Sequence, residues 1–202
     1  MDDFFKIFLT KFGPPFHRDE APASSITRYR EKLPNQLLVY WEKYGWGGYA
    51  DGLFWIVNPQ DYEPIVKEWV DQNPAIAKDT YHVIARNAFG GLHLWGERTE
   101  RILTIDACWA LFSYMTSGLS KDMCIRSFFA ILDVDHCDPQ ELFQCAMDRL
   151  GRLRNDEMYA FVPALALGGV AQAKSLDKVT TVEHLLFLSQ LEPLRQIASM
   201  DV

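Results

Sequence analysis

The sequence predicts an α+β protein with an N-terminal mixed domain, built of a small antiparallel sheet and flanking helices, and a mostly helical C-terminal domain packed against it. Apolar residues repeat at helical spacing in both halves of the chain, whereas strand-like runs occur only in the first half. The segment that joins the halves, Trp109–Leu119, is too poor in proline and serine to be a free linker. We therefore expect two domains in contact, residues 1–110 and residues 111–202.

The composition favours a folded protein that binds something basic. Of the 202 residues, 49% are hydrophobic and 13% are aromatic, which is enough to bury a sizeable core. The formal net charge is −7, and the acidic residues are spread over both halves. Such a charge disfavours nucleic acid or an anionic membrane as the direct partner and suits a partner with a basic surface.

The first residues and the cysteines indicate a cytoplasmic protein. Asp2 and Asp3 stand where a signal peptide carries positive charge, and no apolar run is long enough to span a membrane. The cysteines form no CxxC pair, and we expect them to be reduced thiols: Cys108, Cys124, Cys137 and Cys145.

Helical periodicity and turn residues predict the elements of the first half. The helices are expected at Asp2–Phe12, where phenylalanines share one face, at Pro34–Tyr44, and from Asp61 to Asn73. Residues 17–25 are polar and are expected to be irregular. The strands are expected at Gly52–Val57, Tyr81–Ala88, Leu92–Trp95 and Arg101–Ile105, the last three forming an antiparallel meander because their turns are too short for crossover helices.

The second half is expected to be mostly helical. Helices are predicted at Ser120–Leu132, at Asp138–Leu150 and at Thr181–Ile197, with Pro193 kinking or ending the last. A short apolar segment, Phe161–Gly169, lies between them. Within the second helix, Cys145 is expected to be buried with its apolar neighbours.

The densest aromatic stretch, LPNQLLVYWEKYGWGGYADGLFWIVNP, spans residues 33–59 and has two interpretations. In one, it is a packed core with tight glycine turns. In the other, Trp46, Tyr49 and Asp51 project from a turn as anchors for a partner, since tryptophan and tyrosine are enriched in binding hot spots.

Two possible metal sites have weak support. The run DVDHCD, from Asp133 to Asp138, resembles the start of a calcium loop but lacks the glycine at the sixth position and the glutamate at the twelfth. His136, Cys137 and Cys145 lack the close pair that organises a zinc site. We expect a helix-connecting turn and buried thiols, with no metal and no cofactor.

An enzymatic function also has weak support. His82, His93 and Glu97 are the candidates for acid–base chemistry, but no nucleophile accompanies them. The sequence holds no GxSxG, GxGxxG, phosphate-loop or HExxH motif, and its basic residues do not cluster with aromatics. We therefore expect that the protein is not an enzyme.

Several strings resemble known families. LPNQLLVYWEKYGWGGYADGLFWIVNPQDYEPIVKEWV and the HVIARNAFGGLHLWGE run resemble the GAD-like domain. LDVDHCDPQELFQCAMDRLGRLRNDEMYAFVPALALGG and VEHLLFLSQL resemble the helical domain that commonly follows it. This arrangement is similar to immunity proteins, or antitoxins, of bacterial type VI secretion systems, which neutralise a cognate DNase toxin. The proline-started helix also resembles the wider SMI1/KNR4-like group.

The resemblance implies a DNase inhibitor that acts by protein–protein interaction, occluding the active site or substrate groove of a secreted toxin with a basic surface. From the residues we expect contacts at Trp46, Tyr49, Asp51, Asp133, Asp135, Asp156 and Glu157. Two alternatives stay open: an SMI1/KNR4-like regulatory scaffold without a toxin partner, and an enzyme using His82, His93 and Glu97.

Overall fold

An eight-stranded sheet forms the centre of the protein. The computed structural model describes residues 2–115, 118–138 and 140–197. The strand order is β1-β2-β3-β4-β5-β6-β7-β10, and every pair is antiparallel except β7 with β10. The strands are β1 (His17–Asp19), β2 (Trp46–Tyr49), β3 (Phe54–Ile56), β4 (Tyr81–Asn87), β5 (Gly91–Gly96), β6 (Ile102–Asp106), β7 (Leu111–Met115) and β10 (Arg195–Gln196). The sheet is large and mixed, so the expectation of a small antiparallel sheet was wrong.

The predicted meander is confirmed as β4, β5 and β6, but the sheet extends beyond it on both sides. On one side lies β2, which contains the glycine pair Gly47 and Gly48. A Cβ on Gly47 would lie 2.3 Å from the carbonyl oxygen of His17, and one on Gly48 would lie 2.5 Å from the Phe16 ring. The missing side chains therefore let β1 approach β2, and the glycines sit inside a strand.

The helices predicted at Asp2–Phe12, Pro34–Tyr44 and Ser120–Leu132 are confirmed, with boundaries that shift by one residue. The helices are α1 (Asp3–Phe12), α2 (Ala23–Tyr29), α3 (Asn35–Tyr44), α4 (Glu63–Asp71), α5 (Lys121–Ile131), α6 (Val134–Cys137), α7 (Phe143–Leu150) and α8 (Thr181–Ser189). Short 3₁₀ turns are η1 (Ala50–Gly52), η2 (Pro59–Tyr62), η3 (Leu165–Leu167) and η4 (Ala173–Ser175). Residues 17–25, expected to be irregular, contain β1 and the start of α2.

The C-terminal region mixes helices and strands, so the expectation of a mostly helical domain was also wrong. Strands β8 (Glu157–Phe161) and β9 (Leu176–Thr180) pair as a second, two-stranded sheet. The connection between these strands, residues 162–175, is long, so a search of the sequence for short hairpin turns does not predict the pairing. The last predicted helix stops at Ser189, and the chain returns to the large sheet as β10. The helix predicted from Asp138 begins at Phe143, and Pro139 lies outside the described residues.

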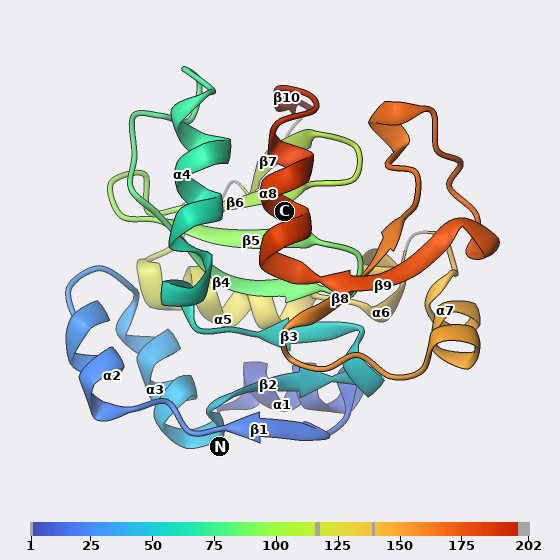
Figure 1. Ribbon diagram of the computed structural model, residues 1–202. Helices are drawn as coiled ribbons and strands as arrows, with labels where there is room; N and C mark the ends of the chain where they lie inside the picture. The colour runs from blue at the N-terminus through green and yellow to red at the C-terminus, as the bar shows by residue number, and fades with distance from the viewer. Residues whose placement is uncertain (1, 116–117, 139, 198–202) are drawn as a thin grey trace.

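Helices cover both faces of the large sheet (Figure 1): α1 and α5 lie behind it, and α4 and α8 lie in front. Behind the sheet, the predicted phenylalanine face of α1 is confirmed, because Phe5, Phe8 and Phe12 are buried. The Phe5 ring stacks on Tyr44 with 4.3 Å between centroids, and Phe8 meets Tyr49 edge-on at 4.9 Å. These aromatic contacts hold the N-terminal helix against β2 and β3.

Three consecutive residues at the end of β4 bind the C-terminal region to the sheet. Arg86 is fully buried, lies 4.9 Å from the Trp55 ring centre, and donates to the carbonyl oxygen of Asn155 at 3.0 Å. Asn87 donates to the carbonyl oxygen of Cys137 at 3.3 Å. The Ala88 carbonyl accepts from the Tyr159 amide of β8 at 2.8 Å. This set, residues 86–88, is called the β4 seam below.

Replacing Arg86 with methionine should destabilise the fold by about 3 kcal/mol. The change fills much of the same volume but removes the donors to the carbonyl oxygens of Asn87 and Asn155 and the cation–π contact. Urea denaturation of both proteins measures the difference. Arg154→Met is the matched control, because its ion pairs are exposed and should contribute less than about 1 kcal/mol. Equal effects of the two substitutions would contradict a special role for the β4 seam.

Because of His93, the free energy of unfolding should fall as the pH is lowered. Burial between Phe54 and Phe128 lowers the pKa of His93 to about 4. The unfolded histidine titrates near its ordinary value of about 6.5, so the unfolded chain gains a proton first as pH falls. The stabilising contribution is complete above about pH 6.5 and is lost on the way down to about pH 4. His93→Gln should therefore remove about 2 kcal/mol of the stability difference between pH 7 and pH 5, measured by urea denaturation.

Candidate functional site

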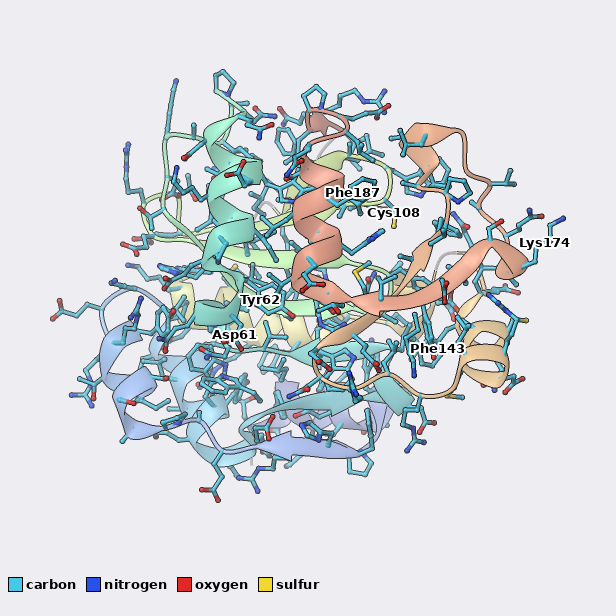
Figure 2. The ribbon with its side chains drawn as sticks, in the orientation of Figure 1. Asp61, Tyr62, Cys108, Phe143, Lys174 and Phe187 are labelled. Atoms are coloured by element: carbon cyan, nitrogen blue, oxygen red, sulfur yellow. The ribbon has the colours of Figure 1, made fainter. Side chains whose placement is uncertain are left out.

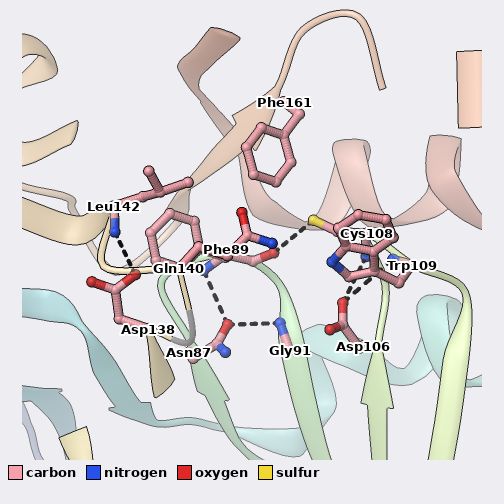
Figure 3. Close-up of a pocket in the computed structure, with 10 residues that line it drawn as sticks. All are labelled: Asn87, Phe89, Gly91, Asp106, Cys108, Trp109, Asp138, Gln140, Leu142 and Phe161. Carbon is pink, nitrogen blue, oxygen red and sulfur yellow. Dashed lines mark hydrogen bonds between the residues drawn. The ribbon is translucent and has the colours of Figure 1, made fainter. Parts of the chain in front are cut away.

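A depression lies where the C-terminal region meets the ends of β4, β5 and β6 (Figure 3). Its cavity volume is about 40 Å³, and it is open to solvent. Its walls come from both regions of the chain, and none of the described residues that line it is a lysine or arginine. We call it the junction depression, and its lining residues are Asn87, Phe89, Gly91, Asp106, Cys108, Trp109, Asp138, Gln140, Leu142 and Phe161.

Asp106 is the least compensated charge in the junction depression. It ends β6, and its Oδ1 accepts only long hydrogen bonds, from the Cys108 amide at 3.2 Å and the Trp109 amide at 3.4 Å. Burial raises the pKa of Asp106, and those two amides offset the rise only in part. No ion pair to Asp106 occurs within the described ranges. A cation from outside would therefore be stabilised here.

The other polar groups of the junction depression are fixed by the backbone. Asp138 accepts from the amides of Leu142 and Phe143, each at 2.8 Å, so its two oxygens hold the start of α7. Asn87 accepts from the amides of Phe89 and Gly91, at 3.0 and 2.7 Å, which closes the turn between β4 and β5. These side chains are preorganised before any partner arrives.

Aromatic side chains form the remaining walls. Trp109 follows β6, and 43% of its surface is exposed. In Figure 3 the Trp109 indole lies above the Asp106 carboxylate, with Phe89 and Phe161 across the depression. The Cys108 thiol donates to the Phe89 carbonyl at 3.2 Å, and burial raises its pKa to about 12, so it stays neutral. Figure 2 labels Cys108 and also Phe187 of α8, whose aromatic side chain is 41% exposed.

A second depression contains Trp46, one of the predicted anchors. It lies between β1, β3 and η2, and its lining includes Asp19, Asp61 and Asn155. Figure 2 shows Asp61 in this region, below α4. Trp46 is half-buried and packs edge-on against Trp41 with 5.6 Å between ring centroids.

Tyr49 does not project from a turn as the sequence suggested. Its side chain is completely buried and packs against Phe8 behind the sheet. The reason is the strand β2, which continues through the glycines and turns Tyr49 toward α1. Tyr49 supports the surface from within, and direct contact with a partner would require a different conformation.

Three of the predicted acidic residues lie beside the second depression, each next to a cation. Asp51 is exposed and accepts from Arg152 at 2.5 Å, which ties η1 to the C-terminal region. Asp156 accepts from Arg154 at 3.2 Å. Glu157 pairs with Arg154 at 3.3 Å and with Lys178 at 3.6 Å. The structure thus brings together residues that are about a hundred positions apart in sequence, although their charges are partly neutralised.

Asp133 and Asp135 are not among the residues that line the junction depression. Both belong to the start of α6, where the Asp133 side chain accepts from the Asp135 amide and lies 3.6 Å from Lys11. Asp138, at the end of α6, lines the junction depression. Among the described residues, no group of three or more histidine, cysteine or acidic side chains is arranged to hold a metal. Cys145, expected to be buried, is exposed on α7.

Only two of the three candidates for acid–base chemistry come together. His82 Nε2 lies 2.6 Å from Glu97 Oε1, and the histidine ring packs against Tyr29. His93 instead bonds Thr104 at 3.2 Å and packs between Phe54 and Phe128. The enzymatic hypothesis therefore loses the three-residue constellation on which it was based.

Sequence reasoning missed Asp106, Trp109 and Asp138 as possible contacts. Trp109 was placed at the join between the halves, and Asp138 at the start of a helix. A turn that follows an alternating strand is a common place for functional residues, and that signal was present at residues 106–109. Their meeting with Phe161 depends on how the C-terminal region docks on the sheet, which local sequence does not encode.

Comparisons with known proteins identify both regions. The family described as GAD-like domain matches residues 3–109, and the family described as T6SS immunity protein Tdi1, C-terminal, matches residues 123–192. The predicted combination of families is therefore confirmed. The two-domain division at residue 110 stays a prediction, and β7 and β10 of the large sheet lie beyond it. No helix among the described residues is long and apolar enough to cross a membrane.

One solved structure shows the same fold. The crystal structure of Atu4351 from Agrobacterium tumefaciens superposes with a TM-score of 0.83 and 19% sequence identity, covering 95% of this chain and 91% of that one. At this identity the likeness concerns the fold alone. No curated protein sequence gives a significant match to the chain.

Replacing Asp51 with asparagine should change stability by less than about 1 kcal/mol. The ion pair to Arg152 is solvent-exposed, and asparagine tolerates the positive φ of 56° at this position. Thermal unfolding measures the effect. Asp51→Ala is the control and should cost more, because a methyl side chain gains nothing in the left-handed region. A large loss with asparagine would show that the pair is structural.

Proposed function

Because the chain belongs to the GAD-like domain family and its C-terminal match supports an immunity role, we propose that it binds and neutralises a cognate type VI secretion DNase effector. The match to the immunity-protein family over residues 123–192 is the observation that carries this proposal. It favours an immunity protein over an SMI1/KNR4-like scaffold, since that scaffold has no toxin partner. The proposed partner is a secreted nuclease, which the resemblance of the sequence to immunity proteins of DNase toxins implies, and inhibition of it needs no catalytic residue in this chain.

The charge of the protein supports occlusion of a DNA-binding groove. A nuclease holds the phosphate backbone with basic residues, so its groove attracts a protein whose net charge is −7. The junction depression offers, beside its aromatic walls, an acid (Asp106) that has no ion pair among the described residues, and the end of α6 contributes Asp138 to its lining. Acidic and aromatic groups of this kind combine fast, steered association with hot-spot contacts.

The surface around Trp46 and Asp51 is a second proposed contact region. Asp156 and Glu157 belong to it, and their pairing with Arg154 means that a partner cation would compete with an existing ion pair. The energetic gain per residue there should be smaller than at a carboxylate without a partner. Tyr49 would contribute by holding β2 in place.

Protection in cells and binding in solution test the proposal together. Co-expression with the nuclease encoded beside this gene should restore growth, and the purified pair should form a complex with a dissociation constant of about 1 nM or lower. DNA cleavage by the purified nuclease should stop once the chain is in molar excess. A nuclease that cuts DNA equally well with the chain present would refute the proposal.

A charge reversal tests whether acidic contacts matter. Asp156→Lys should weaken binding to the nuclease by about tenfold or more, because it places a cation against a basic surface. Asp71→Lys on α4 makes the same change in net charge away from the proposed surface. If both variants bind with the same affinity, the effect is one of overall charge and the contact region around Trp46 is wrong.

A further inference from the structure

The geometry points to a specific occupant for the junction depression: an arginine side chain of the partner protein, stacked on Trp109 and paired with Asp106. This inference rests on the proposed function, since it names the chemistry by which the toxin is held. It assigns the depression a ligand class, a guanidinium group, and a small set of residues that recognise it.

The first argument is charge. Asp106 and Asp138 both line the depression, and none of the described lining residues is a lysine or arginine. Both carboxylate oxygens of Asp138 accept hydrogen bonds from backbone amides at 2.8 Å. In Asp106, one oxygen accepts two long hydrogen bonds. Asp106 therefore keeps acceptor capacity and charge for a donor that arrives from outside.

The second argument is shape. The Trp109 indole lies above the Asp106 carboxylate, and Phe89, Leu142 and Phe161 complete the walls (Figure 3). A guanidinium group is flat, stacks on aromatic faces and donates in a fork that matches a carboxylate. Its aliphatic stem is stabilised by apolar walls of this kind. A small metal ion would leave those walls without contacts, and an anion would be repelled by both acids.

The third argument is position. The depression is built from β4, β5 and β6 on one side and from the C-terminal region on the other, joined by the β4 seam. An arginine bound there contacts both family-matched regions at once. Its walls are held by the hydrogen bonds of Asn87, Cys108 and Asp138, so binding requires little ordering.

Two substitutions remove the two halves of this recognition. Asp106→Asn keeps an oxygen that accepts from the Cys108 and Trp109 amides but removes the charge. Trp109→Ala removes a half-exposed ring, so the fold should persist. Each should weaken binding of the neighbouring-gene nuclease by about tenfold or more, and Asp106→Asn should also reduce the dependence of affinity on salt.

Matched controls are Asp148→Asn on α7 and Val39→Ala on α3, both exposed residues outside the depression. Isothermal titration with a catalytically inactive nuclease gives the dissociation constants, and circular dichroism confirms folding of every variant. An arginine-to-glutamine scan of the nuclease should yield one variant whose loss of affinity disappears against Asp106→Asn, the sign of direct coupling.

The outcomes separate the inference from the proposed function. If the unaltered chain binds and inhibits the nuclease while Asp106→Asn and Trp109→Ala bind within about twofold of it, the arginine site is wrong and the immunity function stands. If the unaltered chain does not bind the nuclease at all, both are wrong. Weakening by both variants, with the controls unchanged, supports the site.

Discussion

The arrangement of this protein depends on a buried cation, Arg86, for which no ion pair with an acidic side chain occurs among the described residues. Arg86 is fully buried, and its guanidinium group is held by the Trp55 ring and by backbone carbonyls of Asn87 and Asn155. Burying such a group is costly unless its donors find acceptors, and the Asn155 carbonyl oxygen accepts from one of them, although the Nε atom has no hydrogen-bond partner among the described residues. Asn87 and Ala88 then fix α6 and β8 to the same strand end. Because three neighbouring residues hold three distant segments, the C-terminal region has one position on the sheet.

That position creates the surfaces on which the proposed function depends. The junction depression exists because Asp138, Gln140, Leu142 and Phe161 lie against the ends of β4, β5 and β6. The second depression has Asn155 as part of its lining, and the Arg152–Asp51 pair bridges the same two regions nearby. A rigid aromatic core behind the sheet supports both. A binding protein gains affinity when its surface is ordered before contact, and the hydrogen bonds on these walls supply that order.

The chemistry of the two depressions differs in a way that matters for inhibition. Three acids near Trp46, namely Asp51, Asp156 and Glu157, are paired with arginines or a lysine, so a partner cation that reached them would have to exchange one ion pair for another. At the junction, Asp106 beside Trp109 has no ion-pair partner within the described residues. A partner cation that binds Asp106 therefore displaces no existing ion pair. This contrast is why the arginine site is placed at the junction, although the sequence first drew attention to residues 46–51.

The sequence by itself determined the periodic elements, the acidic balance and the family resemblance. The phenylalanine face of α1, the helices α3 and α5, and the meander β4–β6 are local patterns in which neighbouring residues encode their own structure. Tertiary structure decided the rest. The short strands β1, β2, β7 and β10 are stable only as members of a sheet that other segments complete, and β9 is separated from β8 by a long loop. Tyr49 became core and Asp106 became accessible for the same reason: burial depends on which distant segments pack together, a property that no local pattern contains.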